Sequence, residues 1–403
     1  MTSLIGIVLL PAIAWLFSTN RAAINWRTVG GAFALQAVVG ALVLYLPVGK
    51  SALEGIASGV DSVLGYSQAG IVFMFGPAVD EGFGFVFAFR VLPVIVFFSS
   101  LVAVLYHVGI MGWVIRLIGG LLQRVLQTSR PESLSAAANI FIGQSEAPLV
   151  VRPFIASMTA SELFAIMVGG MATIAGSVMA GYAQIGIELK YLIAASFMAA
   201  PGALFMAKIV LPETEQPKND LAELDDSGDV VSVNVFDAAA SGALSGMQLA
   251  LAVGAMLVAF TALIALINGM IGGIGGLLGF DGLTFENILG WIFQPLAWAI
   301  GVPWSEAGVA GSFIGQKLVL NEFIAYNAFV DVKDSLSVGA QAIITFALCG
   351  FANFSSIAIL LGGIGSVAPS RRPDLARLGM RALLAATLAN LMSAALAGFF
   401  LAL

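Results

Sequence analysis

Long runs of apolar residues recur along the whole of this chain, and residues 191–211 and 250–271 are two examples. A stretch of about 20 apolar residues crosses a bilayer as a helix. Because the runs are continuous rather than alternating, they exclude a transmembrane β-barrel. Only 10% of the 403 residues are charged, whereas a soluble globular chain has about 25%. The sequence therefore predicts an all-α polytopic membrane protein.

Eight full spans are predicted, at about residues 3–17, 29–48, 91–110, 163–187, 191–211, 250–271, 338–364 and 383–403. Residues 51–89 are Gly-rich and of mixed polarity, which favours one or two short interfacial helices. Three clusters of arginines then fall on one face of the membrane, and they are Arg21 and Arg27, then Arg116, Arg124 and Arg130, and finally Arg371, Arg372, Arg377 and Arg381. The positive-inside rule places this face in the cytoplasm and both termini outside.

Residues 138–148 are the polar exception within this apolar chain, since they contain Asn139, Gln144, Ser145 and Glu146. A carboxylate at membrane depth costs about 2.5–3.5 kcal/mol on insertion scales. Glycine and proline accompany these side chains, so a plain helix is not expected here. We interpret the stretch as a re-entrant hairpin that carries a polar ligand site, since such backbone is tolerated only where protein or water surrounds it.

A second segment resembles the first. The sequence FIGQ occurs at residues 141–144 and again at 313–316. Glu146 follows the first copy and Glu322 the second, and an interrupted apolar span comes after each. By the predicted spans, the two units enter the membrane from opposite faces. Paired Gly-interrupted segments in an inverted repeat indicate the binding site of a secondary transporter.

The residue inventory argues against other classes. The single cysteine, Cys349, excludes an internal disulfide, and the single histidine, His107, excludes a histidine metal cluster. We expect Cys349 to be a small core residue and His107 to be a packing or interface residue of the third span, with a proton relay as the alternative role of His107. No nucleophile–base pair or cofactor fingerprint is evident, which argues against an intramembrane enzyme. A closed polar midpoint argues against an open channel. The first apolar run lacks a basic leader and is expected to be a retained helix.

Four motifs resemble the concentrative nucleoside transporter family, in its bacterial sodium-coupled type. They are residues 143–149 (GQSEAPL), 171–182 (MATIAGSVMAGY), 321–323 (NEF) and 349–356 (CGFANFSS). The likeness covers about residue 133 to the end of the chain, and the first hundred residues match mainly in layout. Some members of this family are driven by protons.

The resemblance implies a homotrimer in the bacterial inner membrane that works by an elevator movement. Residues 1–130 would form scaffold helices, with spans one to three and an interfacial helix, and residues 241–280 would add scaffold span six. The transport unit would comprise residues 131–211, with the first hairpin and spans four and five, and residues 281–403, with the second hairpin and spans seven and eight. Residues 212–240 form an acidic loop, expected to be a solvated linker.

The resemblance also assigns residues to a nucleoside. The nucleobase would be contacted by Gln144, Ser145, Glu146 and Val178. The ribose hydroxyls would be held by Glu322, Asn353 and Ser356, and Gly143 and Phe351 would line the pocket. An amide offers both a donor and an acceptor to a base edge, and a carboxylate accepts two hydroxyls. Neither an organic cofactor nor a nucleic-acid partner is expected.

One sodium ion is implied as the coupling ion. Its ligands would be the side chains of Asn139 and Thr173 and the carbonyl oxygens of Ile142, Thr173 and Ile174. Sodium is a hard cation, and unwound helix segments supply carbonyl oxygens to such ions. Asn139 and Thr173 therefore favour sodium over protons, although the sequence does not exclude proton coupling or fix the base preference.

Each assignment has a structural alternative. Glu146 could pair with Arg152 on the same hairpin, and Glu322 could pair with Lys317. The polar residues after the second break could hydrogen-bond neighbouring helices, and these are Asn353, Ser355 and Ser356. Asn139 could cap the turn of the hairpin instead of binding an ion.

Overall fold

The computed structural model describes residues 2–79, 85–217, 232–277, 279–280 and 282–403. Throughout this described part the chain is helical, with connecting loops and no β-strand, as the sequence predicted. Seven helical segments in it are long and apolar enough to cross a membrane, and they are Trp26–Leu44, Pro47–Val79, Phe87–His107, Ala160–Gln184, Leu189–Val210, Val235–Leu277 and Pro369–Leu401.

The segments differ from the eight predicted spans in three places. Helix α1 (Ser3–Leu16) has 14 residues, fewer than the length of a full span. The predicted interfacial helices, α3 (Pro47–Gly65) and α4 (Ser67–Phe75), are separated at Tyr66, and they lie in a 33-residue helical segment that is long and apolar enough to cross a membrane. The predicted seventh span is divided into α17 (Val338–Leu348) and α18 (Phe354–Val367), at the break that the sequence indicated.

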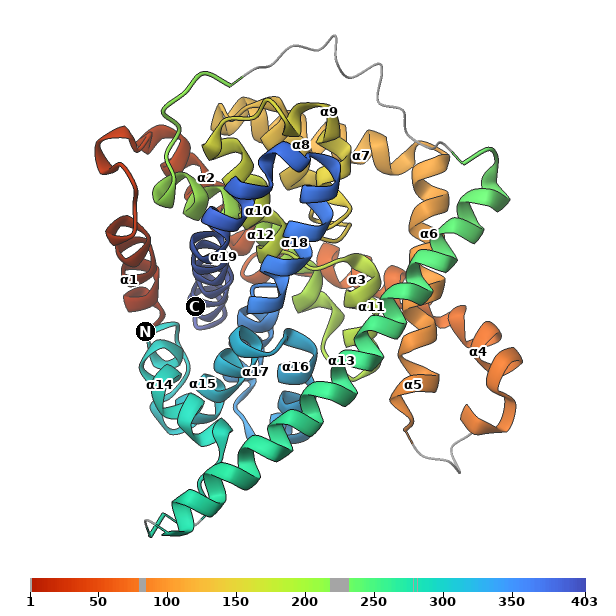
Figure 1. Ribbon diagram of the computed structural model, residues 1–403, viewed down its shortest axis with the longest axis vertical. Coiled ribbons are helices and arrows are strands. Elements are labelled where there is room, and N and C mark those ends of the chain that lie inside the picture. Colours follow the sequence, from red (N-terminus) through yellow and green to blue (C-terminus); the bar gives the residue numbers. More distant parts are fainter. Residues whose placement is uncertain (1, 80–84, 218–231, 278, 281) are drawn as a thin grey trace.

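The apolar helices form two groups that differ in burial (Figure 1). The inner helices are almost entirely surrounded by the rest of the chain, and they are α10 (Ala160–Ala172), α11 (Gly176–Gln184), α12 (Leu189–Val210) and α19 (Arg372–Leu401). The outer helices lie along one side, and they are α6 (Leu92–His107) and α13 (Val235–Leu277). Few residues of either helix are fully buried inside the chain, and α13 is largely exposed. Helix α2 (Trp26–Leu44) packs on α12 and α19.

Helix α13 is longer than a membrane requires. Its 43 residues would extend about 65 Å at 1.5 Å per residue. Two glycines, Gly242 and Gly246, allow it to approach α6 closely, since a Cβ there would lie 2.5 Å and 2.8 Å from the nearest side-chain atoms of α6. Ser100 of α6 also donates a hydrogen bond to the carbonyl oxygen of Ala239 (2.9 Å). Small residues at this spacing are how membrane helices pack closely, so the first part of α13 is fixed to α6.

Two broken helices meet in the interior. Residues 173–175 separate α10 from α11, and residues 349–353 separate α17 from α18. The two breaks are hydrogen-bonded directly, because the N–H of Phe351 donates to the carbonyl oxygen of Thr173 (3.2 Å). The side-chain amide of Asn390 on α19 donates to a carbonyl oxygen beside each break, at 2.6 and 2.9 Å. The backbone groups that the breaks free are therefore partly satisfied inside the protein.

The first hairpin comprises residues 130–155. Helix α8 (Arg130–Ala138) begins with a capping box, in which Ser129 accepts from the N–H of Glu132 and the carboxylate of Glu132 accepts from the N–H of Ser129. After a turn at residues 139–146, the chain returns as the short helices η4 (Ala147–Val151) and α9 (Arg152–Ile155). The capped helix α8 thus positions the polar turn in the interior.

The second hairpin comprises α15 (Trp304–Val319) and α16 (Glu322–Val332), which α14 (Phe285–Ala299) precedes. Asn321 caps α16 by accepting from the N–H of Ile324 (3.0 Å). The repeated FIGQ sequence adopts different structures in the two hairpins, since it is a turn at residues 141–144 and lies within α15 at 313–316. Pro148 closely follows the first copy, whereas no proline follows the second before α15 ends.

Both chain ends lie at the same end of the molecule. Ser3 and Gly398 each contact residues 300–301. The first and third arginine clusters lie away from the termini, since Thr19, beside Arg21, donates to the end of α12 (2.9 Å) and Arg371 donates to the loop after α9 (3.4 Å). The structure therefore agrees with the predicted separation for these two clusters. The centre of the predicted acidic loop, residues 218–231, lies outside the described residues.

Candidate functional site

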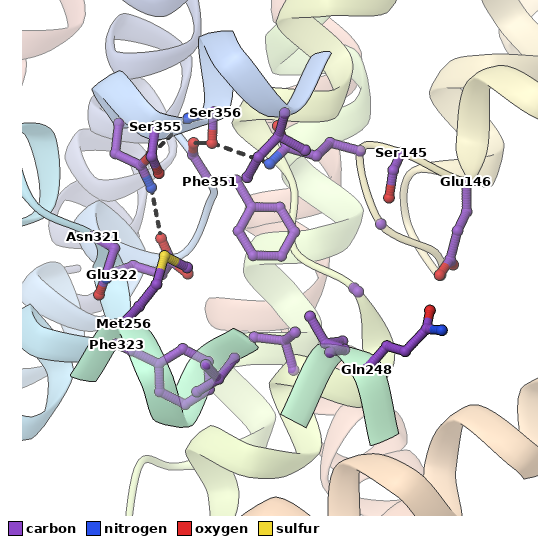
Figure 2. Close-up of a pocket in the computed structure, with 18 of the residues that line it drawn as sticks. Ser145, Glu146, Gln248, Met256, Asn321, Glu322, Phe323, Phe351, Ser355 and Ser356 are labelled. Atoms are coloured by element: carbon purple, nitrogen blue, oxygen red, sulfur yellow. Dashed lines mark hydrogen bonds between the residues drawn. The ribbon is translucent and has the colours of Figure 1, made fainter. Parts of the chain in front are cut away.

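A cavity of about 450 Å³ lies where the two hairpins, the two helix breaks and α13 converge (Figure 2). Cavities that bind small molecules have about 300–1,000 Å³. All nine residues that the sequence assigned to a nucleoside line this cavity, and they are Gly143, Gln144, Ser145, Glu146, Val178, Glu322, Phe351, Asn353 and Ser356. Segments more than 200 residues apart thus come together around one space.

One end of the cavity is organised by Glu322, at the first position of α16. Its side chain is buried, and each carboxylate oxygen accepts one hydrogen bond, from the hydroxyl of Tyr182 (2.9 Å) and from Nδ2 of Asn353 (3.0 Å). A carboxylate has about four acceptor sites, so capacity remains for further donors. The alternative pairing of Glu322 with Lys317 is not formed, since Lys317 instead donates to Asn390 and to a backbone carbonyl.

Asn353 also positions the start of α18. Its Oδ1 accepts from the N–H of Ser356 (2.9 Å) and from Oγ of Ser355 (2.7 Å). One amide therefore caps a helix with its oxygen and orients Glu322 with its nitrogen. The alternative in which Asn353, Ser355 and Ser356 hydrogen-bond neighbouring protein groups is therefore confirmed. Their side chains also line the cavity.

A hydrogen bond joins the first hairpin to this end of the cavity. Nε2 of Gln144 donates to Oγ of Ser356 (3.0 Å), and Ser356 donates in turn to the carbonyl oxygen of Phe351. Oε1 of Gln144 is buried and has no hydrogen-bond partner. An unpaired buried acceptor costs about 1–3 kcal/mol, and a ligand donor at this position would satisfy it.

The other end of the cavity carries Ser145 and Glu146, and the Phe351 ring lies between the two ends (Figure 2). Both side chains are exposed. Glu146 forms no ion pair among the described residues, and Arg152 is exposed, so the alternative pairing of these two residues is wrong. The carboxylate is therefore free to accept from a ligand.

Helix α13 forms a wall of the cavity that the sequence did not predict. Its lining residues are Ser245, Gln248, Leu249, Val253, Met256 and Leu257. Gln248 extends toward the side of the cavity where Glu146 lies (Figure 2). Gln248 lies just before the predicted span at residues 250–271, and a glutamine at the edge of this apolar run was the available signal. It was missed because a span assigned to a scaffold gave no reason to place it beside the hairpins.

The predicted sodium ligands gather behind the turn of the first hairpin. Asn139 is fully buried, and neither its Oδ1 nor its Nδ2 has a hydrogen-bond partner. It lies against α10, because a Cβ on Gly169 would be 3.1 Å from its Nδ2. Thr173 and Ile174, in the adjacent break, are also buried. An asparagine that capped the turn would have a partner, so that alternative is wrong.

The chemistry of these groups suits a hard monovalent cation. The described residues contain no group of three or more His, Cys, Asp and Glu side chains that could hold a metal. Neutral amide, hydroxyl and carbonyl oxygens are the ligands that hard cations prefer. The unpaired amide of Asn139 and the unwound backbone beside it fit such an ion.

Three family models match successive parts of the chain. The model described as the Na+ dependent nucleoside transporter N-terminus matches residues 5–78, and the one described as nucleoside recognition matches residues 88–188. The model of the Na+ dependent nucleoside transporter C-terminus matches residues 191–398. Together they cover almost the whole chain.

Individual proteins agree with these matches. The nucleoside permease NupC of Helicobacter pylori is 50% identical over 412 residues, covering 100% of this chain and 98% of that protein. Human sodium/nucleoside cotransporter 1 is 40% identical, over 99% of this chain and 63% of that protein. A solved structure of CNTnw in an inward-facing substrate-bound state is 58% identical, with a TM-score of 0.95 over 99% of this chain and 97% of that chain.

Proposed function

This chain belongs to the Na+-dependent nucleoside transporter family, and on that premise we propose that it imports nucleosides together with sodium. The predicted resemblance to this family is confirmed, and the family consists of transporters and permeases rather than enzymes. The observation that supports the proposal most is the cavity, in which all nine residues assigned to a nucleoside face one space.

The two polar ends of the cavity match the two halves of a nucleoside. Glu322, held by Tyr182 and Asn353, would accept hydrogen bonds from the ribose hydroxyls, with Ser356 beside it. Ser145 and Glu146 would face the nucleobase at the other end, with Val178 and Gly143 beside them. Gln144, whose side chain reaches across to Ser356, would contact the nucleobase with its unpaired Oε1. The Phe351 ring between the ends would pack against the flat, apolar face of the ligand.

Sodium would enter as a co-substrate at Asn139. Its unpaired amide oxygen, the hydroxyl of Thr173 and the carbonyl oxygens of Ile142, Thr173 and Ile174 would form the ligand set. Because this site adjoins the turn that carries Gln144, binding of the ion would fix the turn in its nucleoside-binding form. Proton coupling is the second candidate, and Glu146 would then carry the proton.

The larger assembly completes the proposal. Alternating access would proceed by movement of the hairpins and inner helices along the outer helices, since the cavity lies between these parts. The chain would act as a homotrimer in the bacterial inner membrane, with both termini outside and the arginine clusters in the cytoplasm.

The decisive experiment measures uptake into proteoliposomes. A panel of purine and pyrimidine nucleosides would compete with labelled uridine, in sodium or in choline buffer at fixed pH. We expect saturable uptake in sodium alone and recovery of chemically unchanged substrate. If uptake is equal in both buffers and rises with a pH gradient, protons rather than sodium are the coupling ion.

Asn139→Leu tests the ion site within the same assay. The substitution keeps the size of the side chain and removes the amide oxygen, so sodium-driven uptake should fall by at least about 10-fold. Asn20→Leu is the matched control, because Asn20 is exposed and far from the cavity. Unchanged sodium dependence in Asn139→Leu would refute this site.

A further inference from the structure

Lys317 is a buried cation that the proposed transport mechanism does not use. It lies on α15, its side chain is 4% exposed, and its Nζ donates to the carbonyl oxygen of Ala347 (2.8 Å) and to Oδ1 of Asn390 (2.7 Å). It forms no ion pair with a carboxylate among the described residues. Both of its partners are neutral oxygens, which is the environment that a bound metal cation would have.

The other buried lysine of the described chain shows the contrast. Lys208 is 6% exposed, but it pairs with the carboxylate of Glu132 and lies 3.9 Å from that of Glu213. Its charge is compensated by acidic side chains at the base of the first hairpin. The carboxylate of Glu322 interacts electrostatically with Lys317 but forms no ion pair with it. Burial of a charge that is not directly paired costs several kcal/mol, so the position of Lys317 calls for a further source of negative potential.

That source is the meeting point of two helix ends. α10 ends at Ala172 and α17 ends at Leu348, and the last carbonyl groups of a helix carry a partial negative charge. Asn390 donates to the carbonyl oxygens of Ala172 and Cys349, while its own Oδ1 accepts from Lys317. The ammonium group is thus connected to both helix ends through one amide.

Gly350 shows how tightly this point is packed. Its φ of +148° is unfavourable for residues with a side chain. A Cβ there would lie 2.5 Å from Oδ1 of Asn390 and 2.7 Å from the carbonyl oxygen of Ala172. The close approach brings the two helix ends within reach of a single cation.

The two broken helices therefore differ in the polar groups that lie beside the break. At the break after α10, the amide of Asn139 is buried without a partner. At the break after α17, the ammonium group of Lys317 supplies the positive charge beside the carbonyl oxygens. We propose that the ammonium group of Lys317 is a tethered cation, which does at the second break what a sodium ion from solution does at the first.

This inference rests on the proposed sodium site and has a distinct consequence. If Lys317 fills a cation position, its replacement by a short oxygen-bearing side chain opens a second site for a monovalent cation. The variant Lys317→Asn should then depend on two sodium ions where the wild type depends on one. A lysine that only fills space would leave the number of ions unchanged.

The test follows thermal unfolding of the detergent-solubilised protein as sodium replaces choline at constant ionic strength. We expect a Hill coefficient for sodium of about 1 in the wild type and about 2 in Lys317→Asn. Lys208→Asn is the matched control, since it also removes a buried lysine and should lose stability with the Hill coefficient unchanged. A folded Lys317→Asn with the wild-type sodium dependence would overturn the proposal.

Two further variants decide the matter if Lys317→Asn does not fold. Lys317→Arg retains the charge and should unfold near the wild-type temperature, whereas Lys317→Met should unfold well below it at every sodium concentration. Equal stability of Lys317→Met and the wild type would overturn the proposal. Absence of any sodium dependence in the wild type would instead refute the proposed coupling ion, so the two failures are distinguishable.

Discussion

Helices α12 and α13 are both long and apolar, yet their surroundings are opposite. In the most apolar 18-residue part of each, 94% of the α12 residues are buried inside the chain and 11% of those in α13. α12 is rich in small residues, and these include Ala194, Ala195, Ala199, Ala200, Gly202 and Ala203. α13 exposes large ones, among them Leu251, Val258, Leu266 and Met270.

The difference shows what selects the inner helices. Lipid is as apolar as leucine, so hydrophobicity alone does not bring membrane helices together, whereas small residues and interhelical hydrogen bonds do. Gly202 of α12 illustrates both effects, because a Cβ there would lie 2.4 Å from Nε2 of Gln36, which donates to Ser393 (2.9 Å). The cavity lies between these two kinds of helix, with most of its polar groups on the inner side and Ser245 and Gln248 on α13.

The largest effect should come from the polar inner side. Glu322→Gln keeps the shape of the side chain and removes the charge that Tyr182 and Asn353 orient. Hydrogen bonds to charged groups contribute about 1.5–3 kcal/mol, so we expect nucleoside uptake in proteoliposomes to fall about 10- to 100-fold.

Glu54→Gln is the control for this change. Glu54 is exposed on α3 and does not line the cavity, so its neutralisation should leave uptake at the wild-type level. Equal losses in the two variants would mean that overall charge, rather than the cavity, controls uptake, and the distinction between inner and outer polar groups would fail.

A smaller effect is expected where α13 is fixed to α6. Gly242→Leu would force a side chain into the space of Ala103, and overpacking of this kind costs about 1–3 kcal/mol. The midpoint of thermal unfolding should fall. Gly269→Leu lies on the same helix with nothing within 4 Å of its added Cβ, and it should unfold like the wild type. A similar fall in unfolding temperature in both variants would indicate that the loss of stability does not come from the contact between α13 and α6.

The smallest effect belongs to the cavity wall on α13. Gln248 extends toward the side of the cavity where Glu146 lies (Figure 2), and its loss removes one neutral hydrogen-bonding group of about 0.5–1.5 kcal/mol. Gln248→Ala should raise KM for uptake about 2- to 10-fold, with the size depending on the nucleobase. Thr261→Ala, exposed on the same helix and outside the cavity, should not change KM. An identical KM in Gln248→Ala would leave α13 as a passive wall.

Much of the fold was predictable because the bilayer restricts the choices. Apolar length predicted the helices, and glycines with polar neighbours predicted the breaks at residues 173–175 and 349–353. The motif around Gln144 and Glu146 predicted one end of the cavity. The FIGQ match was less informative than it looked, since identical residues form a turn in one hairpin and a helix in the other.

By itself, the sequence determined the helical class, the two polar interruptions and the residue types available for a nucleoside and an ion. The first two follow from local rules of length, polarity and backbone freedom, and the third from the resemblance to a transporter family. Only the tertiary structure decided that Gln248 faces the cavity, that Glu322 is held by Tyr182, and that Lys317 lies between two helix ends. Such contacts join residues far apart in the chain, and in lipid they depend on close packing and hydrogen bonding, which hydropathy does not encode.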